Sequence, residues 1–305
     1  MTEISLSPSP RPLISIIIAV YNDWKSLEGC LRSLTEQKDG TKFEVIVADD
    51  GSDEPAPESI REWEAKYPLK IVRLPHAGIS NARNRATEIS LGTILFYSDA
   101  DCRLYPDCLS KLAIAIAEAP QHDYFQLHLV GDRRGSVGKA EELRLTMLQQ
   151  QTLQPDGRIH YLNTAGFAIR RTAVDIKKGV FDPAALRAED TFFMASLIQR
   201  GKLPLFVSSA TVQHSIPLTL TECIRKDFRS VWLEARTYEM IASKGVKFRL
   251  SYRERFSMLR SMWKTARTLK LGSWPWFVVS GRQGLRLVVS YGYHFLRRVR
   301  KFGSN

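Results

Sequence analysis

The sequence predicts an α/β protein with a Rossmann-like, mostly parallel central sheet, helices on both faces and a helical extension at the C-terminus. First, residues 13–20 (LISIIIAV) form an apolar run that is too short for a lone helix and apolar on both faces, which is typical of a central parallel strand. Second, short apolar runs alternate with segments of helical periodicity. Third, polar clusters follow several of these runs, and open α/β sheets bind ligands at the carboxyl ends of their strands.

The alternation is clearest in the first hundred residues. A helix is predicted over 24–37, because Leu27, Leu31 and Leu34 recur at helical spacing. The pattern then predicts, in order, a strand over 43–48, a helix over 59–67, a strand over 69–74, a helix over 79–90 and a strand over 92–97.

Beyond residue 105 the alternation is looser. An amphipathic helix is predicted over 191–200, and Gly201 ends it. The other expected elements are a helix over 106–119, a strand over 124–130, a Gly/Arg-rich loop over 131–138, a helix over 139–151, a strand and turn over 160–169, and short strands over 203–208 and 211–213.

Charge divides the chain into a near-neutral body and a basic tail. The net charge is +12, yet residues 221–305 alone hold 19 Lys and Arg against 5 Asp and Glu. We therefore expect a disordered segment over 1–12, a folded domain over 13–218 and a basic amphipathic helical region over 219–305.

Cysteine usage and hydropathy suggest a compartment. The four cysteines show neither a C-x-x-C pair nor zinc-ligand spacing, which predicts free thiols in a reducing environment. The chain opens without an apolar leader and has no run of 18 uncharged apolar residues. These features predict a cytoplasmic protein.

Two carboxylates, Asp99 and Asp101, stand two residues apart where a strand should end. In an extended chain residues i and i+2 point the same way, so both can converge on one cation. Hard oxygen ligands suit Mg²⁺ or Mn²⁺, which commonly join carboxylates to phosphates. Taken alone, the pair is more typical of a polar turn, and its surroundings must decide.

Six stretches in a fixed order supply those surroundings. They are IIIAVYN at 16–22, VIVADDGSD at 45–53, GISNARNRA at 78–86, YSDAD at 97–101, NTAGFAIRR at 163–171 and the segment 179–201. Together they resemble the family-2 glycosyltransferases, inverting enzymes of the GT-A fold, over residues 13–215. The resemblance implies a nucleotide-binding half over 13–101 and an acceptor-side half over 102–218. Ala19 stands where the family usually has Pro, a change that would only loosen the exit from the strand.

The resemblance implies a nucleotide-sugar site. Tyr21 would stack beside the base, and Asp50 would accept from the imide N–H of uracil, whereas Asp49 would cap a turn. Arg83 would reach the diphosphate as a planar fork, and Arg85 would be structural or solvated. The full set implied to contact the nucleotide-sugar is Val20, Tyr21, Asp50, Arg83, Asp99 and Ala100.

The resemblance also implies the chemistry. Asp101 would bind Mn²⁺ or Mg²⁺ directly, Asp99 would bond the ribose and approach the metal, and the ion would stabilise charge on the leaving β-phosphate. His214 is a candidate third ligand, although a lone His more often has another role. Asp190 would be the general base, and its place at a helix N-terminus predicts a lowered pKa. The plainer interpretation is that Glu189 and Asp190 only complement the helix dipole.

The basic tail has two interpretations. Residues 251–301 combine apolar positions at helical spacing with Lys, Arg and Trp, which predicts contact with an anionic bilayer and a peripheral place on the inner face of the cell membrane. A helical cap packed on the domain is the alternative. No nucleic-acid motif accompanies the charge, so no nucleic-acid partner is expected.

The predicted function is transfer of a sugar from a nucleotide-sugar, best a UDP-sugar, to a glycan or lipid-linked acceptor in surface polysaccharide or glycoconjugate synthesis. One alternative is a nucleotidyltransferase on a similar sheet, but Tyr21 and the two residues after it are unlike the Gly-rich loop of that class. The other is a non-catalytic membrane-associated protein with a relic nucleotide site.

Overall fold

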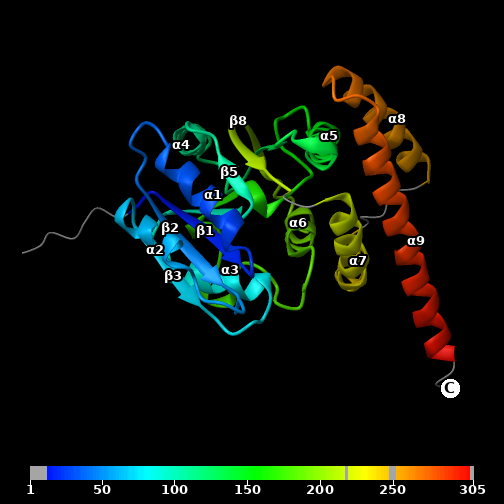
Figure 1. Cartoon of the computed structure of the whole chain (residues 1–305), viewed down its shortest axis with the longest axis horizontal. Helices are drawn as coiled ribbons and strands as arrows, with labels where there is room; N and C mark the ends of the chain where they lie inside the picture. Colours follow the sequence, from blue (N-terminus) through cyan, green and yellow to red (C-terminus); the bar gives the residue numbers. More distant parts are fainter. Residues whose placement is uncertain (1–11, 217–218, 247–251, 303–305) are drawn as a thin grey trace, which may run out of the picture.

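A computed structural model describes residues 12–216, 219–246 and 252–302, without the side chains of 252–257, 291 and 293–302 (Figure 1). Within these residues, eight strands form one mixed sheet flanked by helices, as predicted. The segment expected to be a disordered tail falls almost wholly on residues 1–11, outside the described residues.

The N-terminal half of the sheet is parallel. Its strands are β1 (Ile14–Val20), β2 (Phe43–Asp49), β3 (Leu69–Arg73) and β4 (Ile94–Asp99). β1 lies between β2 and β4 and runs parallel to both, and β3 adds to the outer edge of β2. The central position predicted for the first strand is therefore confirmed.

Helices cover both faces of this half because the side chains of β1 alternate. Ile16 and Ile18 pack on one face with α1 (Trp24–Thr35), whereas Ile17 packs on the other with Ala82 and Ala86 of α3 (Ile79–Ile89). The helix predicted over 59–67 is shorter than expected: it is one turn, α2 (Glu58–Arg61), followed by a 3₁₀ turn at Glu62–Ala65.

The second half of the sheet is mixed. It contains β5 (Cys102–Leu104), β6 (Tyr124–Gly131), β7 (Phe167–Arg170) and β8 (Leu205–His214), and the complete strand order is β3-β2-β1-β4-β7-β6-β8-β5. The helices of this half are α4 (Cys108–Glu118), α5 (Gly135–Thr152) and α6 (Glu189–Gln199). Part of the predicted 131–138 loop is thus the first turn of α5.

The prediction of two short strands over 203–208 and 211–213 was wrong. β8 is one strand whose pairing with β6 shifts register, because Leu127 pairs with Val207 but His128 pairs with Thr211. The residues between these partners form an irregularity that interrupts the apolar pattern without ending the strand.

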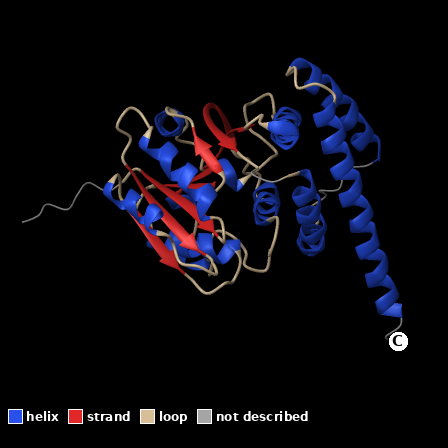
Figure 2. Ribbon diagram, viewed as in Figure 1, coloured by secondary structure: helices blue, strands red, loops and turns tan. Residues whose placement is uncertain are grey.

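Three C-terminal helices lie beyond α5 and α6, on the side away from β1–β3 (Figures 1 and 2). They are α7 (Leu220–Ser243), α8 (Tyr252–Thr268) and α9 (Trp274–Phe302). Ala140, Leu143 and Met147 of α5 form an apolar cluster with buried residues of α8 and α9. No helix in the described parts of the chain is long and apolar enough to cross a bilayer.

Charged pairs also join these helices. Arg282 of α9 bonds Asp227 of α7, with Nε 2.7 Å from a carboxylate oxygen, and Arg286 bonds both Asp227 and Glu234. Part of the predicted membrane surface is therefore packed and paired within the protein. The side chains of 252–257, 291 and 293–302, which belong to the same predicted surface, lie outside the described residues.

Candidate active site

The parallel strands β1, β2 and β4 place the motifs that end them at the same, carboxyl end of the sheet. In the register of β1, Val20 lies opposite Asp49 of β2, and Ala19 lies opposite Asp99 of β4. Tyr21 and Asp50 follow directly, so they lie at the same carboxyl ends of the strands as Asp99, with β1 between Asp50 and Asp99.

The exit from β1 is held in an unusual backbone conformation. Asn22 has φ 53°, in the left-handed region that non-glycine residues seldom adopt. Its backbone N–H donates to Ser52 Oγ at 2.9 Å, and its side chain exchanges hydrogen bonds with Asp53. These bonds connect the first motif to the second, and Tyr21 beside them is 47% exposed.

Asp49 and Asp50 have different partners. Asp49 Oδ1 accepts from the Ser52 N–H at 2.8 Å, which confirms the turn expected there. The Asp50 carboxylate accepts from the backbone N–H groups of Ala77 and Gly78, at 2.9 and 3.1 Å, where α3 begins. The contact between Asp50 and uracil stays a prediction, and the carboxylate already accepts hydrogen bonds from the backbone before α3.

His76 joins this group, although the sequence motifs do not single it out. Its ring stacks on Tyr21 with centroids 4.4 Å apart and an interplanar angle of 23°. Its Nδ1 lies 2.9 Å from the Asp50 carbonyl oxygen and 3.0 Å from Asp50 Oδ2. Tyr21 and His76 thus form one stacked surface beside Asp50.

Arg83 is fully buried and joins two carboxylates. Its Nη2 donates to Asp99 Oδ1 at 2.5 Å and its Nη1 to Glu189 Oε1. Burial lowers the pKa of the guanidinium, but Asp99 and Glu189 raise it more, so the net direction is upward. The diphosphate role of Arg83 stays a prediction, because here its terminal nitrogens connect the D-x-D strand to α6. Arg85 is exposed and pairs with Glu88, as expected.

Asp190 is the second residue of α6, which begins directly after Ala188, a residue in the left-handed region at φ 58°. Its Oδ1 accepts from the Thr191 N–H at 2.6 Å. Burial, followed by the charge of Glu189, raises the pKa of Asp190 to about 7. The expectation of a lowered pKa was wrong, because desolvation and a like charge outweigh the helix dipole and the Thr191 hydrogen bonds.

Asp101 and His214 come together because β5 pairs with β8. Cys102 lies opposite His214 in that register, and the Ser215 N–H donates to the Asp101 carbonyl oxygen at 2.9 Å. His214 Nε2 is 3.4 Å from Asp101 Oδ1. Asp101, Cys102 and His214 each offer a ligand atom, all within 4.8 Å of one another.

The donor set fits a divalent cation. Carboxylate and imidazole together suit Mn²⁺ better than Mg²⁺, which prefers oxygen. Burial raises the pKa of the Cys102 thiol well above its usual value, so it stays protonated and is a poor ligand for a hard ion. Asp101 and His214 are therefore the residues that could hold the metal, whereas the Asp99 carboxylate is bonded to Arg83.

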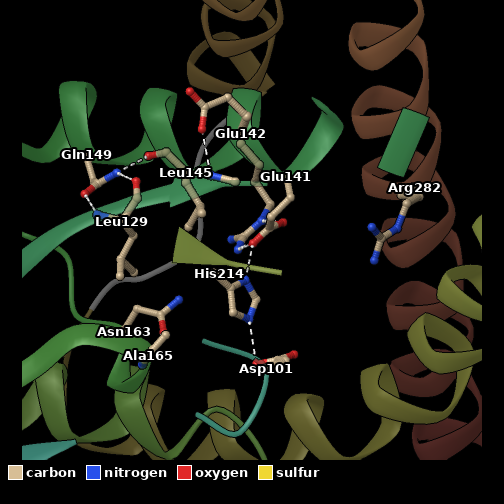
Figure 3. A network of polar contacts seen from close by, with 12 residues as sticks. Asp101, Leu129, Glu141, Glu142, Leu145, Gln149, Asn163, Ala165, His214 and Arg282 are labelled. Carbon is tan, nitrogen blue, oxygen red and sulfur yellow. Dashed lines mark hydrogen bonds and ion pairs between the residues drawn. The ribbon is translucent and has the colours of Figure 1, made fainter. Parts of the chain in front are cut away.

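Two residues behind His214, Glu141 and Arg144, also belong to the site and were not predicted from the sequence. Glu141 of α5 lies with Oε1 3.0 Å from His214 Nδ1, opposite the side that faces Asp101 (Figure 3). Arg144 donates to both oxygens of Glu141, at 2.8 and 2.5 Å. No sequence motif marks these two residues, which reach the site only through the packing of α5 on the sheet.

Comparison with known proteins gives a consistent picture. The model of the family described as glycosyl transferase family 2 matches residues 15–177. The glycosyltransferase AglE of Haloferax volcanii is 35% identical over 106 residues, which are 34% of this chain and 35% of that protein. A dolichol-phosphate mannosyltransferase of Pyrococcus furiosus is 32% identical over 104 residues, 34% of this chain and 30% of that one. The matched stretch thus spans about a third of the length of these curated relatives.

Solved structures share the fold over more of the chain. The mannosyltransferase PcManGT from Pyrobaculum calidifontis, in complex with GDP-Man and Mn²⁺, has a TM-score of 0.57 at 17% identity, covering 92% of this chain and 76% of that one. S. aureus TarS 1–349 in complex with UDP-GlcNAc has a TM-score of 0.55 at 17% identity, covering 92% and 91%. At these identities the likeness establishes the GT-A fold alone.

Proposed function

This chain belongs to glycosyltransferase family 2, and from that membership we propose that it is an inverting hexosyl- or related transferase. It moves a sugar from a nucleotide-sugar to a glycan or lipid-linked acceptor in surface polysaccharide or glycoconjugate synthesis. One observation carries the proposal. Tyr21, Asp50 and Asp99 lie at the carboxyl ends of neighbouring strands. Arg83 pairs with Asp99 there and with Glu189, which precedes Asp190 in α6. Membership of this family sets the nucleotidyltransferase alternative aside.

A UDP-sugar is the donor we propose. The base stacks on the exposed Tyr21–His76 surface, and its imide N–H replaces the His76 nitrogen at Asp50 Oδ2. A carboxylate can accept about four hydrogen bonds, so the backbone donors of Ala77 and Gly78 are retained. Solved proteins with this fold bind nucleotide-sugars of two kinds: PcManGT binds GDP-Man, and TarS binds UDP-GlcNAc.

Asp101 and His214 are the proposed metal ligands, with Mn²⁺ favoured by the imidazole. When bound, the ion neutralises the charge that develops on the departing β-phosphate. Asp99 keeps the Arg83 contact on one oxygen and offers the other to the ribose.

Asp190 is the proposed general base. It takes the proton of the acceptor hydroxyl as that oxygen attacks the sugar from the face opposite the leaving group. A pKa of about 7 suits this work at neutral pH, because the carboxylate is ionised in a large fraction of molecules and is a stronger base than an ordinary Asp. The Thr191 N–H and hydroxyl, both bonded to Oδ1, hold the carboxylate in place.

Thermal unfolding with UDP, GDP and ADP, each with and without Mn²⁺, tests the donor and the metal. We expect stabilisation by UDP that increases with Mn²⁺. Asp190→Asn should keep that stabilisation and lose sugar transfer. Stabilisation by no nucleotide would overturn the proposal and favour a relic site.

We also propose a peripheral place on the cytoplasmic face of an anionic membrane. Trp263, Trp274 and Phe277 of α8 and α9 are 37%, 58% and 54% exposed and lie among basic residues. Deleting α8 and α9 would uncover the apolar cluster on α5, so the sharper test is Trp274→Ser with Phe277→Ser against Leu91→Ser, a change at an exposed apolar residue of the catalytic domain. Only the double variant should lose binding to anionic vesicles at physiological salt, and intact protein that ignores such vesicles would refute this proposal.

A further inference from the structure

We infer that Glu141 is the residue that orients His214 for metal binding, with Arg144 holding it in place. Glu141 does not touch the substrate or the metal, so it is a positioning residue. This inference rests on the proposed metal site at Asp101 and His214.

The first observation is the line of contacts through His214. Its Nε2 faces Asp101 Oδ1 at 3.4 Å, and its Nδ1 faces Glu141 Oε1 at 3.0 Å (Figure 3). An imidazole that binds a metal through Nε2 carries its proton on Nδ1, and a carboxylate at Nδ1 accepts that proton's hydrogen bond and fixes the plane of the ring. Glu141 therefore orients Nε2 of His214 toward the place where the Asp101 carboxylate also points.

The second observation is that Glu141 cannot move away easily. It is 3% exposed, and Arg144, one helical turn later, donates Nε to one of its oxygens and Nη2 to the other. A bidentate pair of this kind fixes both the position and the plane of the carboxylate.

The third observation explains how α5 reaches the metal site. Gly131, the last residue of β6, pairs with His214 in the sheet. A Cβ on Gly131 would lie 2.5 Å from the backbone nitrogen of Glu142, so only glycine allows α5 to approach this closely. On its other side α5 is covered by α8 and α9 through Leu143 and Met147. Glu141 is thus delivered to the strand partner of Gly131 by a helix that is packed on both sides.

Glu142 provides a matched control. It lies on the same helix and is also 3% exposed, but it accepts from the Gly131 N–H at 2.6 Å and from Arg133, and it has no contact with His214. Glu→Gln at either position removes one buried charge from α5. Only the change at Glu141 alters the group that faces the histidine.

The physical effect of Glu141→Gln follows from its single oxygen. If that oxygen turns to Arg144, the amide NH₂ faces His214 Nδ1 and forces the ring proton onto Nε2, where it blocks the metal. If the oxygen turns to His214, the amide NH₂ faces the Arg144 guanidinium. Both groups are hydrogen-bond donors, so no hydrogen bond forms between them. Either arrangement weakens the metal site.

The experiment measures the dissociation constant for Mn²⁺ by the EPR signal of the free ion, with and without saturating UDP, and the unfolding midpoint without metal. We expect Glu141→Gln to raise the Mn²⁺ Kd about 10- to 100-fold, and Glu142→Gln to leave it within about 3-fold of wild type. Should Glu141→Gln not fold, Arg144→Lys takes its place, because Lys keeps the charge but cannot hold both oxygens, and a weakened Kd is again expected.

If the wild type binds Mn²⁺ and Glu141→Gln, or Arg144→Lys in its place, leaves the Kd unchanged, this inference alone is overturned. Equal weakening in the Glu141 and Glu142 variants would also overturn it, because that result means general loosening of α5. Wild-type protein that binds no Mn²⁺ would overturn the proposed metal site and this inference with it.

Discussion

Asp190 is expected to cost the protein stability, and the cost can be worked out from its surroundings. Its pKa rises from an ordinary 3.8 to about 7 in the folded protein. Between these values the folded state binds more protons than the unfolded state, so stability falls as the pH rises from about 4 to about 7. The complete rise corresponds to about 4 kcal/mol at about 1.36 kcal/mol per pKa unit. Because the side chain keeps some contact with water, we take about 2 kcal/mol.

Asp190→Asn removes the titrating group and keeps an oxygen that accepts from the Thr191 N–H. We therefore expect the variant to be more stable than wild type by about 2 kcal/mol at pH 8, with the difference shrinking toward zero as the pH falls to about 4. Urea unfolding of both proteins across this pH range measures the difference. The same variant should be inactive in sugar transfer, so the gain in stability comes with a loss of function.

The neighbouring acid is a control of opposite sign. Glu189→Gln removes the carboxylate that pairs with the buried Arg83, and breaking a buried pair typically costs about 3 to 5 kcal/mol. A variant at Asp190 that is less stable than wild type at pH 8, or whose gain does not change with pH, would refute the reasoning.

Two further predictions concern packing and buried charge. Arg83→Met should lower the free energy of unfolding by about 3 to 5 kcal/mol, because it leaves two carboxylates without their cation. Arg85→Met, on the surface, should change it by less than about 0.5 kcal/mol. Equal effects of the two substitutions in urea unfolding would contradict this prediction. Gly92→Ala should destabilise the protein by about 2 kcal/mol, since the new Cβ would lie 2.6 Å from the Ser15 nitrogen. Gly284→Ala within α9 meets nothing within 4 Å and should stabilise the protein by up to about 1 kcal/mol. Thermal unfolding that gives both changes the same sign would refute this prediction.

The parallel half of the fold could be predicted from sequence because its signals are local. The apolar run of β1 and the spacing of Leu27, Leu31 and Leu34 report burial and helical faces without reference to distant residues. The mixed half could not be ordered, because β7, β6, β8 and β5 are paired by contacts between residues far apart in the chain. The register shift in β8 looked like a gap between strands because it breaks an apolar pattern that a straight strand would keep.

The site divides in the same way. Residues inside contiguous motifs, such as Tyr21 and Asp101, could be proposed from their order along the chain. His76 and Glu141 could not, because only tertiary contacts bring the first onto Tyr21 and the second onto His214. The direction of the Asp190 pKa was missed for a related reason: a sequence displays a helix N-terminus but not the amount of water around it.

The place of β8 in the sheet has a consequence for how the protein is made. The edge strand β5, directly after Asp101, has β8 as its sheet neighbour, and β8 ends about 110 residues later in the chain. At the usual pace of translation, about 5 to 20 residues per second, a ribosome needs roughly 6 to 22 s to travel that far. During that interval the nascent chain contains Asp101 without His214, the second ligand of the proposed metal site. The proposed metal site therefore becomes complete only late in synthesis, when β8 pairs with β5.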